Sequence, residues 1–427
     1  MERTLIKELG KKDKQKVLIK GRVLNVRILG SITFVVVQDY TGSVQTVWEK
    51  PVETIAGETV EIEGEVRLEP RAKGGVELGG EKLAAISKNT ETLPYDFASR
   101  DLNLNLATLL DLRTTSLRHP KAQAVFKLYD LLLEAYEKTM RQEGFTEVKT
   151  PRILEAASEG GANFFKIKYF DKDAYLAQSP QFYKQIIVGV FERVFEIGPV
   201  FRAEPHFTTR HVNEYVSLDA EMGFIKNFRD VTTMLNKVIK QVFDHLRENG
   251  KDYLELYKAE IPEVPEKIPE IKLADLRKLV KEKYDYEIPK NTDIDPEGER
   301  LACRWAKEEY GSDFVFINNY FWKDKPFYTM PSDDKQEETE GFDLLFRGTE
   351  IATGSQRIHE YEKLIKNMEA KGVKPNGMEF YLDTFKFAMP PHGGWGLGSE
   401  RIIQLILGLG SVKEAVLFPR DVKRLNP

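Results

Sequence analysis

Cysteine is nearly absent from this sequence, because Cys303 is the only one among its 427 residues. A single thiol cannot form an internal disulfide or supply the thiolates of a structural zinc site, so both classes of protein are excluded. The sequence also lacks any run approaching the roughly 20 apolar residues that a membrane helix requires. Its charged start, MERTLIKELGKKDKQK, has no apolar centre of the kind found in signal peptides. These absences predict a cytoplasmic globular protein with no membrane segment.

The charge is close to balanced, with a net value of −5, which argues against binding nucleic acid over the whole surface. Residues 1–30 depart from this balance, since they carry nine Lys or Arg against three Asp or Glu. A nucleic-acid face at the N-terminus is therefore one interpretation, and an ordinary solvated surface is the other. The length predicts two or three domains at roughly 150 residues each.

The first region, residues 17–87, is a series of five short alternating segments separated by turn residues such as Thr41-Gly42. Five strands within so short a stretch predict a small closed β-barrel. The OB-fold is the barrel of this kind that presents a strand face to oligonucleotides. We therefore expect an OB-fold domain over residues 1–90, followed by a polar linker over residues 91–118.

The second region begins at His119-Pro120, where proline in a first helical turn precedes apolar residues at helical spacing as far as Gly144. Beyond it, strands and helices mix without regular βαβ alternation. This pattern predicts an α+β domain over residues 119–427, built on an antiparallel sheet flanked by helices. Residues 260–300, rich in proline and charge, are predicted to be an insertion with a helix near residues 273–284.

Three segments of the second region gather groups that bind anions or metal ions. In residues 201–224, Arg202 and Arg210 lie in a loop between strand-like runs, and guanidinium groups bind phosphate or carboxylate oxygens through paired hydrogen bonds. In residues 346–360, Glu350 is a carboxylate of the type that Mg²⁺ prefers. In residues 392–409, a glycine-rich strand enters an apolar helix at Arg401.

Each segment alone also has a plain structural interpretation, as a surface hairpin, a solvated strand acid or a common glycine turn. Strand alternation places Glu350 and Thr353 on opposite faces, unless a bulge at Gly354 rotates the chain. Three such segments in one domain, together with an oligonucleotide-type barrel, favour a functional interpretation.

Taken in order, the three segments resemble the signature motifs of the class II aminoacyl-tRNA synthetases. The barrel-first layout resembles the subgroup for aspartate, asparagine and lysine. EGFTEVKTPRI, residues 143–153, resembles motif 1 and ends near an interface proline, Pro151, which implies a homodimer. FRAE through Arg210-His211 resembles motif 2, and GLGSER resembles motif 3. Because no large insert separates motifs 2 and 3, the chain is similar to the compact archaeal type of aspartyl-tRNA synthetase.

The resemblance implies a catalytic centre that uses ATP and Mg²⁺. Arg202 should bridge the amino-acid carboxylate and the α-phosphate, with Glu350 and Arg401 completing the catalytic set. Glu350, helped by Thr353, should hold Mg²⁺, and adenine should lie between Tyr215 and Arg401. The full set implied for ATP is Arg202, Glu204, Arg210, His211, Tyr215, Glu350, Gly398 and Arg401.

Amino-acid choice depends on QSPQFYKQ, residues 178–185, which resembles a strand of the aspartate enzymes, since asparagine enzymes have an apolar residue at the position of Lys184. Lys184 and Arg357 are expected to bind the side-chain carboxylate. Glu159, in SEGG, resembles part of a loop that closes over the substrate and meets its ammonium group. The set implied for L-aspartate is Glu159, Gln181, Lys184, Arg202, Thr353 and Arg357.

In the barrel, Arg27, Phe34 and Gln45 occupy positions where this family reads the tRNA anticodon, with Phe34 stacking on a base. Phe34 as ordinary barrel core is the alternative. The family divides into enzymes strict for tRNA(Asp) and enzymes that also charge tRNA(Asn). Strict enzymes tend to have Trp at the position of Leu24 and Lys at the position of Lys73, whereas relaxed enzymes tend to have His at the first. Because Leu24 fits neither pattern, both tRNA partners stay open.

Two rival interpretations come from the same resemblance. One is an asparaginyl-tRNA synthetase, against which Lys184 and Pro180 argue. The other is a non-catalytic paralogue that keeps the fold as an RNA-binding module, against which the filled catalytic positions argue.

Overall fold

The computed structural model describes residues 1–72, 74–155, 164–205, 208–290, 292–333, 335, 337–375 and 377–426. The chain forms two compact units, Met1–Asn105 and Leu106–Pro427. Residues 106–118, expected in a linker, contain two short helices of the second unit, α1 (Leu106–Asp111) and α2 (Arg113–Ser116). No helix among the described residues is long and apolar enough to cross a membrane.

The first unit is the predicted five-stranded barrel, closed in the order β1-β2-β3-β5-β4. Its core is made of the inward residues of each strand, as the alternation of buried Val35 and Val37 with half-buried neighbours on β2 illustrates. A short 3-10 helix, Ile6–Lys11, adds Ile6 and Leu9 to this core. The strands are β1 (Lys16–Leu29), β2 (Ile32–Asp39), β3 (Gly42–Trp48), β4 (Thr59–Leu68) and β5 (Val76–Ser87).

The second unit is built on an eight-stranded sheet in the order β12-β13-β14-β15-β16-β11-β10-β6. The six central strands pair antiparallel as predicted, whereas the edge strands β12 and β6 pair parallel with their neighbours, so the sheet is mixed. The strands are β6 (Thr146–Glu147), β10 (Arg193–Phe201), β11 (Glu214–Gly223), β12 (Glu270–Lys272), β13 (Phe314–Asn318), β14 (Gly341–Phe346), β15 (Thr349–Arg357) and β16 (His392–Gly398).

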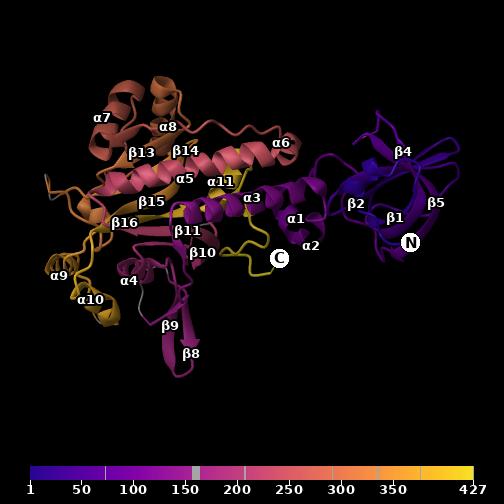
Figure 1. Cartoon of the computed structure of the whole chain (residues 1–427). Coiled ribbons are helices and arrows are strands. Elements are labelled where there is room, and N and C mark those ends of the chain that lie inside the picture. Colours follow the sequence, from indigo (N-terminus) through magenta and orange to yellow (C-terminus); the bar gives the residue numbers. More distant parts are fainter. Residues whose placement is uncertain are drawn as a thin grey trace. The chain divides into compact units, whose positions relative to one another are not determined.

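Two long helices, α3 (Pro120–Gln142) and α5 (Phe228–Asn249), lie side by side along the sheet (Figure 1). The start predicted for α3 is confirmed, because His119 is its N-cap and accepts a hydrogen bond from the Lys121 backbone N–H. The apolar stripes of both helices share one core with the sheet, and this core includes Phe228, Phe342 and Trp395.

The remaining helices surround this layer: α4 (Gln181–Phe191), α6 (Lys251–Tyr257), α7 (Leu273–Tyr284), α8 (Pro296–Tyr310), α9 (Tyr361–Ala370), α10 (Glu379–Phe385) and α11 (Ser399–Leu407), with 3-10 turns at Trp322–Asp324 and Val412–Ala415. The helix predicted near residues 273–284 is α7. It packs with α8 around a separate apolar core that includes Leu276 and Trp305. The insertion is thus packed against β13 and β14 of the main sheet, because Val315, Ile317 and Leu345 belong to the same core.

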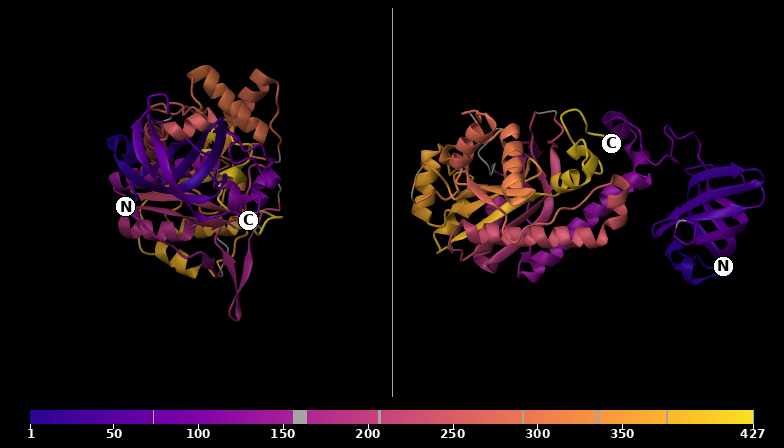
Figure 2. Two further views of the ribbon diagram at one scale, coloured as in Figure 1. Left: turned by 90° about the vertical axis from the view of Figure 1, so that its right-hand side faces the viewer. Right: turned by 90° about the horizontal axis from the view of Figure 1, so that it is seen from above.

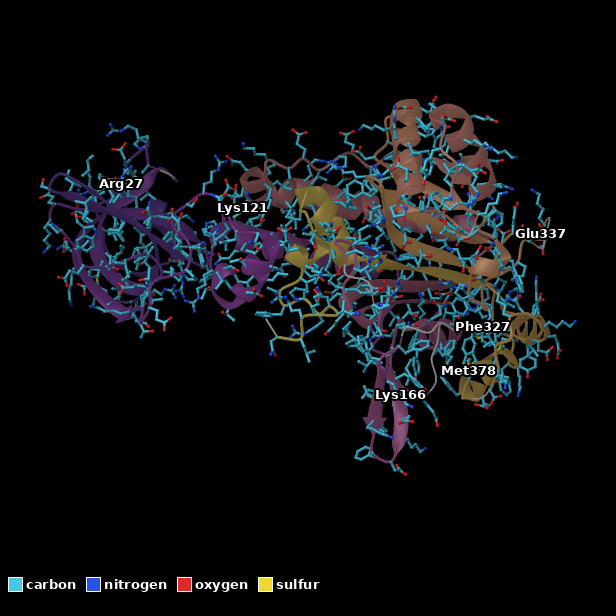
Figure 3. All side chains as sticks on the ribbon, turned by 180° about the vertical axis from the view of Figure 1, so that it is seen from behind. Arg27, Lys121, Lys166, Phe327, Glu337 and Met378 are labelled. Atoms are coloured by element: carbon cyan, nitrogen blue, oxygen red, sulfur yellow. The ribbon has the colours of Figure 1, made fainter. Side chains whose placement is uncertain are left out.

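A three-stranded sheet of β7 (Ile153–Leu154), β9 (Lys172–Leu176) and β8 (Lys166–Tyr169) forms a projecting hairpin (Figures 1 and 2). Lys166 lies on this hairpin (Figure 3). Phe327 and Met378 lie together near α9 and α10 and belong to the apolar cluster that supports α4 (Figure 3).

Gly394 on β16 allows the closest approach between strands near the centre of the sheet. A Cβ added there would lie 2.0 Å from the carbonyl oxygen of Ala220 and 2.3 Å from the Glu221 carboxylate. Glycine is therefore required if Glu221 is to lie across β16.

Replacing Gly394 with alanine is expected to lower the free energy of unfolding by about 1 to 3 kcal/mol, because the added methyl group displaces a buried carboxylate and backbone. The measurement is urea denaturation of the full chain. Gly396→Ala on the same strand is the control, since its Cβ would meet nothing closer than the Asp219 carboxylate at 3.4 Å. Equal stability of the two variants would contradict this account.

Candidate functional site

One pocket in the second unit brings together the ends of α4, β11, β15 and β16. Its volume of about 350 Å³ is within the range of roughly 300 to 1,000 Å³ typical of small-molecule sites. Twelve residues singled out from the sequence line it: Gln181, Lys184, Arg202, Glu204, Arg210, His211, Tyr215, Glu350, Thr353, Arg357, Gly398 and Arg401. The structure therefore places four sequence segments, residues 178–185, 201–224, 346–360 and 392–409, around a single cavity.

Residues 178–185 were expected in a strand, and this expectation is wrong: helix α4 begins at Gln181, directly after Pro180. Spacings of three and four residues place Gln181, Lys184 and Gln185 on the same face of that helix. All three are buried. The helix therefore delivers Lys184 to the pocket from one side, and the sheet supplies the opposite side.

Lys184 belongs to a buried group of four charges. Its ammonium nitrogen lies 3.0 Å from Asp219 Oδ1 and 3.5 Å from Glu221 Oε2, and it donates a hydrogen bond to the Trp395 carbonyl at 3.0 Å. Arg357 donates through Nε to Glu221 Oε1 at 2.9 Å. Glu221 thus joins the two cations that the sequence predicted to act together.

Glu221 is fully buried, and burial alone would raise its pKa. The charges of Arg357 and Lys184 and a hydrogen bond from Arg357 outweigh burial and hold the pKa below its usual value. The carboxylate is therefore ionised, and the four-charge group is neutral as a whole. Because buried charges are costly unless paired, this group fixes α4 against β11 and β15.

The outer half of the pocket is more exposed and carries the motif 2 residues. Arg202, with its side chain 42% exposed, lies over the ring of Tyr215 at 5.6 Å and 3.9 Å from Glu204. His211 Nε2 lies 3.5 Å from Glu204 Oε2, and His211 Nδ1 lies 2.6 Å from the Thr208 hydroxyl. Burial raises the pKa of Tyr215, so its ring faces the pocket as a neutral phenol.

The two other arginines of the pocket are each paired with a carboxylate. Arg210 forms an ion pair with Glu299 of α8. Burial raises the pKa of Glu299 above its usual value, and the charge of Arg210 offsets only part of this rise. Arg401 donates to the Glu350 carbonyl at 2.8 Å and to its carboxylate at 3.4 Å. An anionic ligand at this end of the pocket must therefore compete with internal anions.

Strand β15 contains a bulge, but the bulge is not at Gly354, the position that the sequence suggested. The register with β14 shifts at Ile351, because Leu344 faces Ala352 whereas Leu345 faces Glu350. The extra residue brings Glu350 to the pocket face that Thr353 and Arg357 reach by normal alternation. Both members of the expected Mg²⁺ pair therefore line the same cavity.

The polar residues of this site that sequence reasoning missed include Ser217, Asp219, Glu221, Glu299 and Lys325. Three of them occur at alternate positions of β11, on the face that also carries Tyr215, so strand periodicity was the signal that could have found them. Lys325 lies 3.1 Å from Asp343, a pair joined only by the tertiary fold.

The barrel residues lie together on the outward face of β1 to β3. Arg27 is opposite Phe34 in the β1–β2 register, and its guanidinium carbon lies 5.2 Å from the centre of that ring. Gln45 faces Val36, which shares the outward side of β2 with Phe34. Phe34 is half-buried and outside the barrel core, so the alternative of a core residue is wrong. Figure 3 places Arg27 on the barrel.

Two residues of the sequence analysis, Glu159 and Lys73, lie outside the described residues. Leu24 is half-buried on β1. Within the part of the chain that the structure describes, no group of three or more His, Cys, Asp or Glu side chains is arranged to hold a metal ion.

The family model described as "tRNA synthetases class II (D, K and N)" matches residues 105–422. The chain is 45% identical to the Aspartate–tRNA(Asp/Asn) ligase of Deinococcus radiodurans, covering 100% of this chain and 99% of that one. It is 41% identical to the Aspartate–tRNA(Asp) ligase of Pyrococcus abyssi, covering 97% and 96% of the two chains.

Among solved structures, the asparaginyl-tRNA synthetase of Pyrococcus horikoshii with bound asparaginyl-adenylate superposes with a TM-score of 0.91 at 30% identity over both whole chains. The aspartyl-tRNA synthetase of Entamoeba histolytica gives 0.85 at 28% identity, covering 100% of this chain and 93% of that one. With its barrel, its eight-stranded sheet and these full-length relatives, the chain belongs to the class II aminoacyl-tRNA synthetases of the D, K and N group.

Proposed function

We propose that the chain activates L-aspartate with ATP to aspartyl-adenylate and then transfers the aspartyl group to the 3′ end of tRNA(Asp). The observation that carries this proposal is the buried pair of cations, Lys184 and Arg357, in the pocket wall. Asp219 and Glu221 pair with these cations within the chain, yet a second carboxylate is attracted to Lys184 and Arg357 where an uncharged amide is not. The names of full-length relatives at 40 to 45% identity support the same substrate.

In the first step, an oxygen of the aspartate α-carboxylate attacks the α-phosphorus of ATP, the bond to the α,β-bridging oxygen breaks, and pyrophosphate leaves. Arg202 is proposed to contact both the carboxylate and the α-phosphate and to offset the charge that builds between them. Tyr215 and Arg401 hold the adenine between a ring and a guanidinium group.

The remaining polar groups of the site are proposed to bind the parts of ATP and aspartate that do not react. Glu204, Arg210 and His211 hold the adenine edge and the outer phosphates, with Gly398 allowing close approach of the nucleotide. Gln181 contacts the aspartate, and Glu159 meets its ammonium group.

Glu350, helped by Thr353, is proposed to hold Mg²⁺. The donor set fits this ion, because Mg²⁺ is commonly bound through one or two carboxylates while phosphates and water complete its octahedron. When bound, the ion neutralises charge on the pyrophosphate leaving group.

In the second step, a 3′-terminal ribose hydroxyl of the tRNA attacks the aspartyl carbonyl, and AMP leaves. We assign residues 1–90 to anticodon binding through Arg27, Phe34 and Gln45, and residues 119–427 to catalysis with an insertion at 260–300. The hinge expected over residues 91–118 is restricted to the part before Leu106, because residues 106–118 belong to the second unit. Motif 1, with Pro151, is proposed to form a homodimer interface. The proposed place of action is the cytoplasm, where tRNA is charged.

A second candidate function is charging of tRNA(Asn) with aspartate. The relatives at 45%, 42% and 40% identity, from Deinococcus radiodurans, Aeropyrum pernix and Thermus thermophilus, are named for both tRNAs. Relatives at 41% from Pyrococcus are named for tRNA(Asp) alone.

Pyrophosphate exchange run separately with aspartate and asparagine tests the amino-acid assignment. We expect kcat/KM for aspartate to exceed that for asparagine by at least about 1,000-fold, because the uncharged amide gains no charge attraction from Lys184 and Arg357. Lys184→Met is expected to lower kcat/KM for aspartate by at least about 100-fold, through loss of a charge contact in a buried site.

The control for this substitution is Lys168→Met, since Lys168 is 78% exposed on the hairpin. Thermal unfolding of each variant shows whether the fold is retained. Preference for asparagine in the wild type would establish the asparaginyl enzyme instead. Exchange absent with all twenty amino acids would favour the non-catalytic paralogue.

Arg202→Ala and Phe34→Ala are expected to separate the two halves of the reaction. The first should abolish adenylate formation while tRNA binding stays within about 3-fold, since Arg202 is proposed to contact the carboxylate and the α-phosphate and not the anticodon. The second should weaken tRNA charging by about 10-fold, from the loss of roughly 1 to 3 kcal/mol of stacking, and leave exchange unchanged. Loss of the same step in both variants would disprove this division.

Aminoacylation of purified tRNA(Asp) and tRNA(Asn), side by side with aspartate, tests the second candidate. Some relatives are named as ligases for both tRNAs. If this chain shares that function, its charging rates for tRNA(Asp) and tRNA(Asn) should agree within about 10-fold. Charging confined to tRNA(Asp) would remove this candidate and leave the primary proposal intact.

A further inference from the structure

Behind the amino-acid end of the pocket lies a row of buried polar side chains that the proposed chemistry does not use, apart from its first member. Gln181 and Gln185 are on α4, Tyr381 is on α10, and His392 begins β16. Their exposed fractions are 4%, 0%, 0% and 0%, respectively. Each buried donor here needs an acceptor and each buried acceptor needs a donor, since a buried polar group without a hydrogen bond lowers the stability of the fold.

The row begins at a backbone carbonyl, which can only accept hydrogen bonds. His392 Nδ1 lies 2.8 Å from the Pro390 carbonyl oxygen, so Nδ1 carries a proton. Burial is the largest influence on this ring and lowers its pKa to about 4, so the imidazole is neutral at ordinary pH. A neutral ring protonated at Nδ1 has a lone pair at Nε2, and Nε2 is therefore an acceptor.

The acceptor on His392 fixes the orientation of the next amide. Gln185 has one amide atom 3.0 Å from His392 Nε2, and only its NH₂ group can donate there. Its oxygen must then face the other way, where the Tyr381 hydroxyl donates to it from 3.2 Å and the Gln181 NH₂ group from 2.9 Å. One amide oxygen has two lone pairs, so it satisfies both donors.

The chain of hydrogen bonds ends at Gln181, which lines the pocket. Its nitrogen is directed to Gln185, so the oxygen is the atom of this amide oriented toward the pocket that Gln181 lines. An amide turned by 180° fits the same space but would present a donor instead. The Pro390 carbonyl, about two hundred residues away in sequence, therefore decides which atom a ligand meets.

We propose that His392, Gln185 and Tyr381 are positioning residues that fix the Gln181 amide with its oxygen toward the α-ammonium group of the amino-acid substrate. This inference rests on the proposed function, since it assumes that an amino acid occupies this end of the pocket. An ammonium group has three donors and no acceptor, so it pairs with the oxygen and is repelled by a turned NH₂ group.

The test uses His392→Leu, which removes the acceptor, and His392→Gln, which restores an oxygen that can accept from Gln185. Aspartate KM is measured by pyrophosphate exchange, and the inhibition constant of succinate is measured in the same assay. Succinate has both carboxylates of aspartate but lacks the ammonium group. Its inhibition constant therefore measures binding to the pocket without the contact between the ammonium group and Gln181.

We expect His392→Leu to raise the aspartate KM about 10-fold, which is the scale of one hydrogen bond to a charged group. The succinate inhibition constant and kcat should stay within about 2-fold, and His392→Gln should recover most of the KM. In a Gln181→Ala background, His392→Leu should have no further effect on KM, because it acts through Gln181.

The matched control is His119→Leu, which removes another buried histidine, 2% exposed, at the N-cap of α3. It should lower thermal stability without changing the aspartate KM. Equal weakening of succinate and aspartate by His392→Leu, or an undiminished effect in the Gln181→Ala background, would overturn the positioning role. A wild-type protein that activates no aspartate would instead overturn the proposed function, and this inference with it.

Discussion

The four buried charges of Lys184, Asp219, Glu221 and Arg357 are the constraint on which the rest of the pocket depends. They come from a helix and two strands, and each charge is paired only while all three elements keep their places. Separating any one of them would leave a buried ion without a partner, which is strongly destabilising. The register between β11 and β16, which requires glycine at position 394, therefore also holds Glu221 in this charge group.

The two ends of the pocket differ in how firmly their charges are held. Lys184 and Arg357 have side chains 4% and 6% exposed, whereas Arg202, at the opposite end, is 42% exposed. Arg210 and Arg401 are paired with carboxylates that a phosphate can replace. In the proposed function, the rigid amino-acid end gives selectivity through preformed charge, and the exposed end lets a large nucleotide enter and rearrange its partners.

The fold does not decide the amino acid. An asparaginyl enzyme superposes on this chain with a TM-score of 0.91, close to the 0.85 of an aspartyl enzyme. The same sheet and helices therefore support both chemistries, and the choice lies with side chains at a few positions. Lys184 is the informative position because its charge is buried and cannot be neutralised by water, so it changes the energy of a charged ligand relative to a neutral one.

The sequence by itself determined the barrel and the helix from Pro120, because these depend on local periodicity, and its resemblance to known motifs indicated twelve of the residues that line the pocket. It did not determine that residues 181–191 form a helix, since a short apolar run suits a strand equally well. Nor did it locate the register shift at Ile351, or pair Gln185 with His392. Those features depend on contacts between segments far apart in the chain, which only the packed tertiary structure brings within hydrogen-bonding distance.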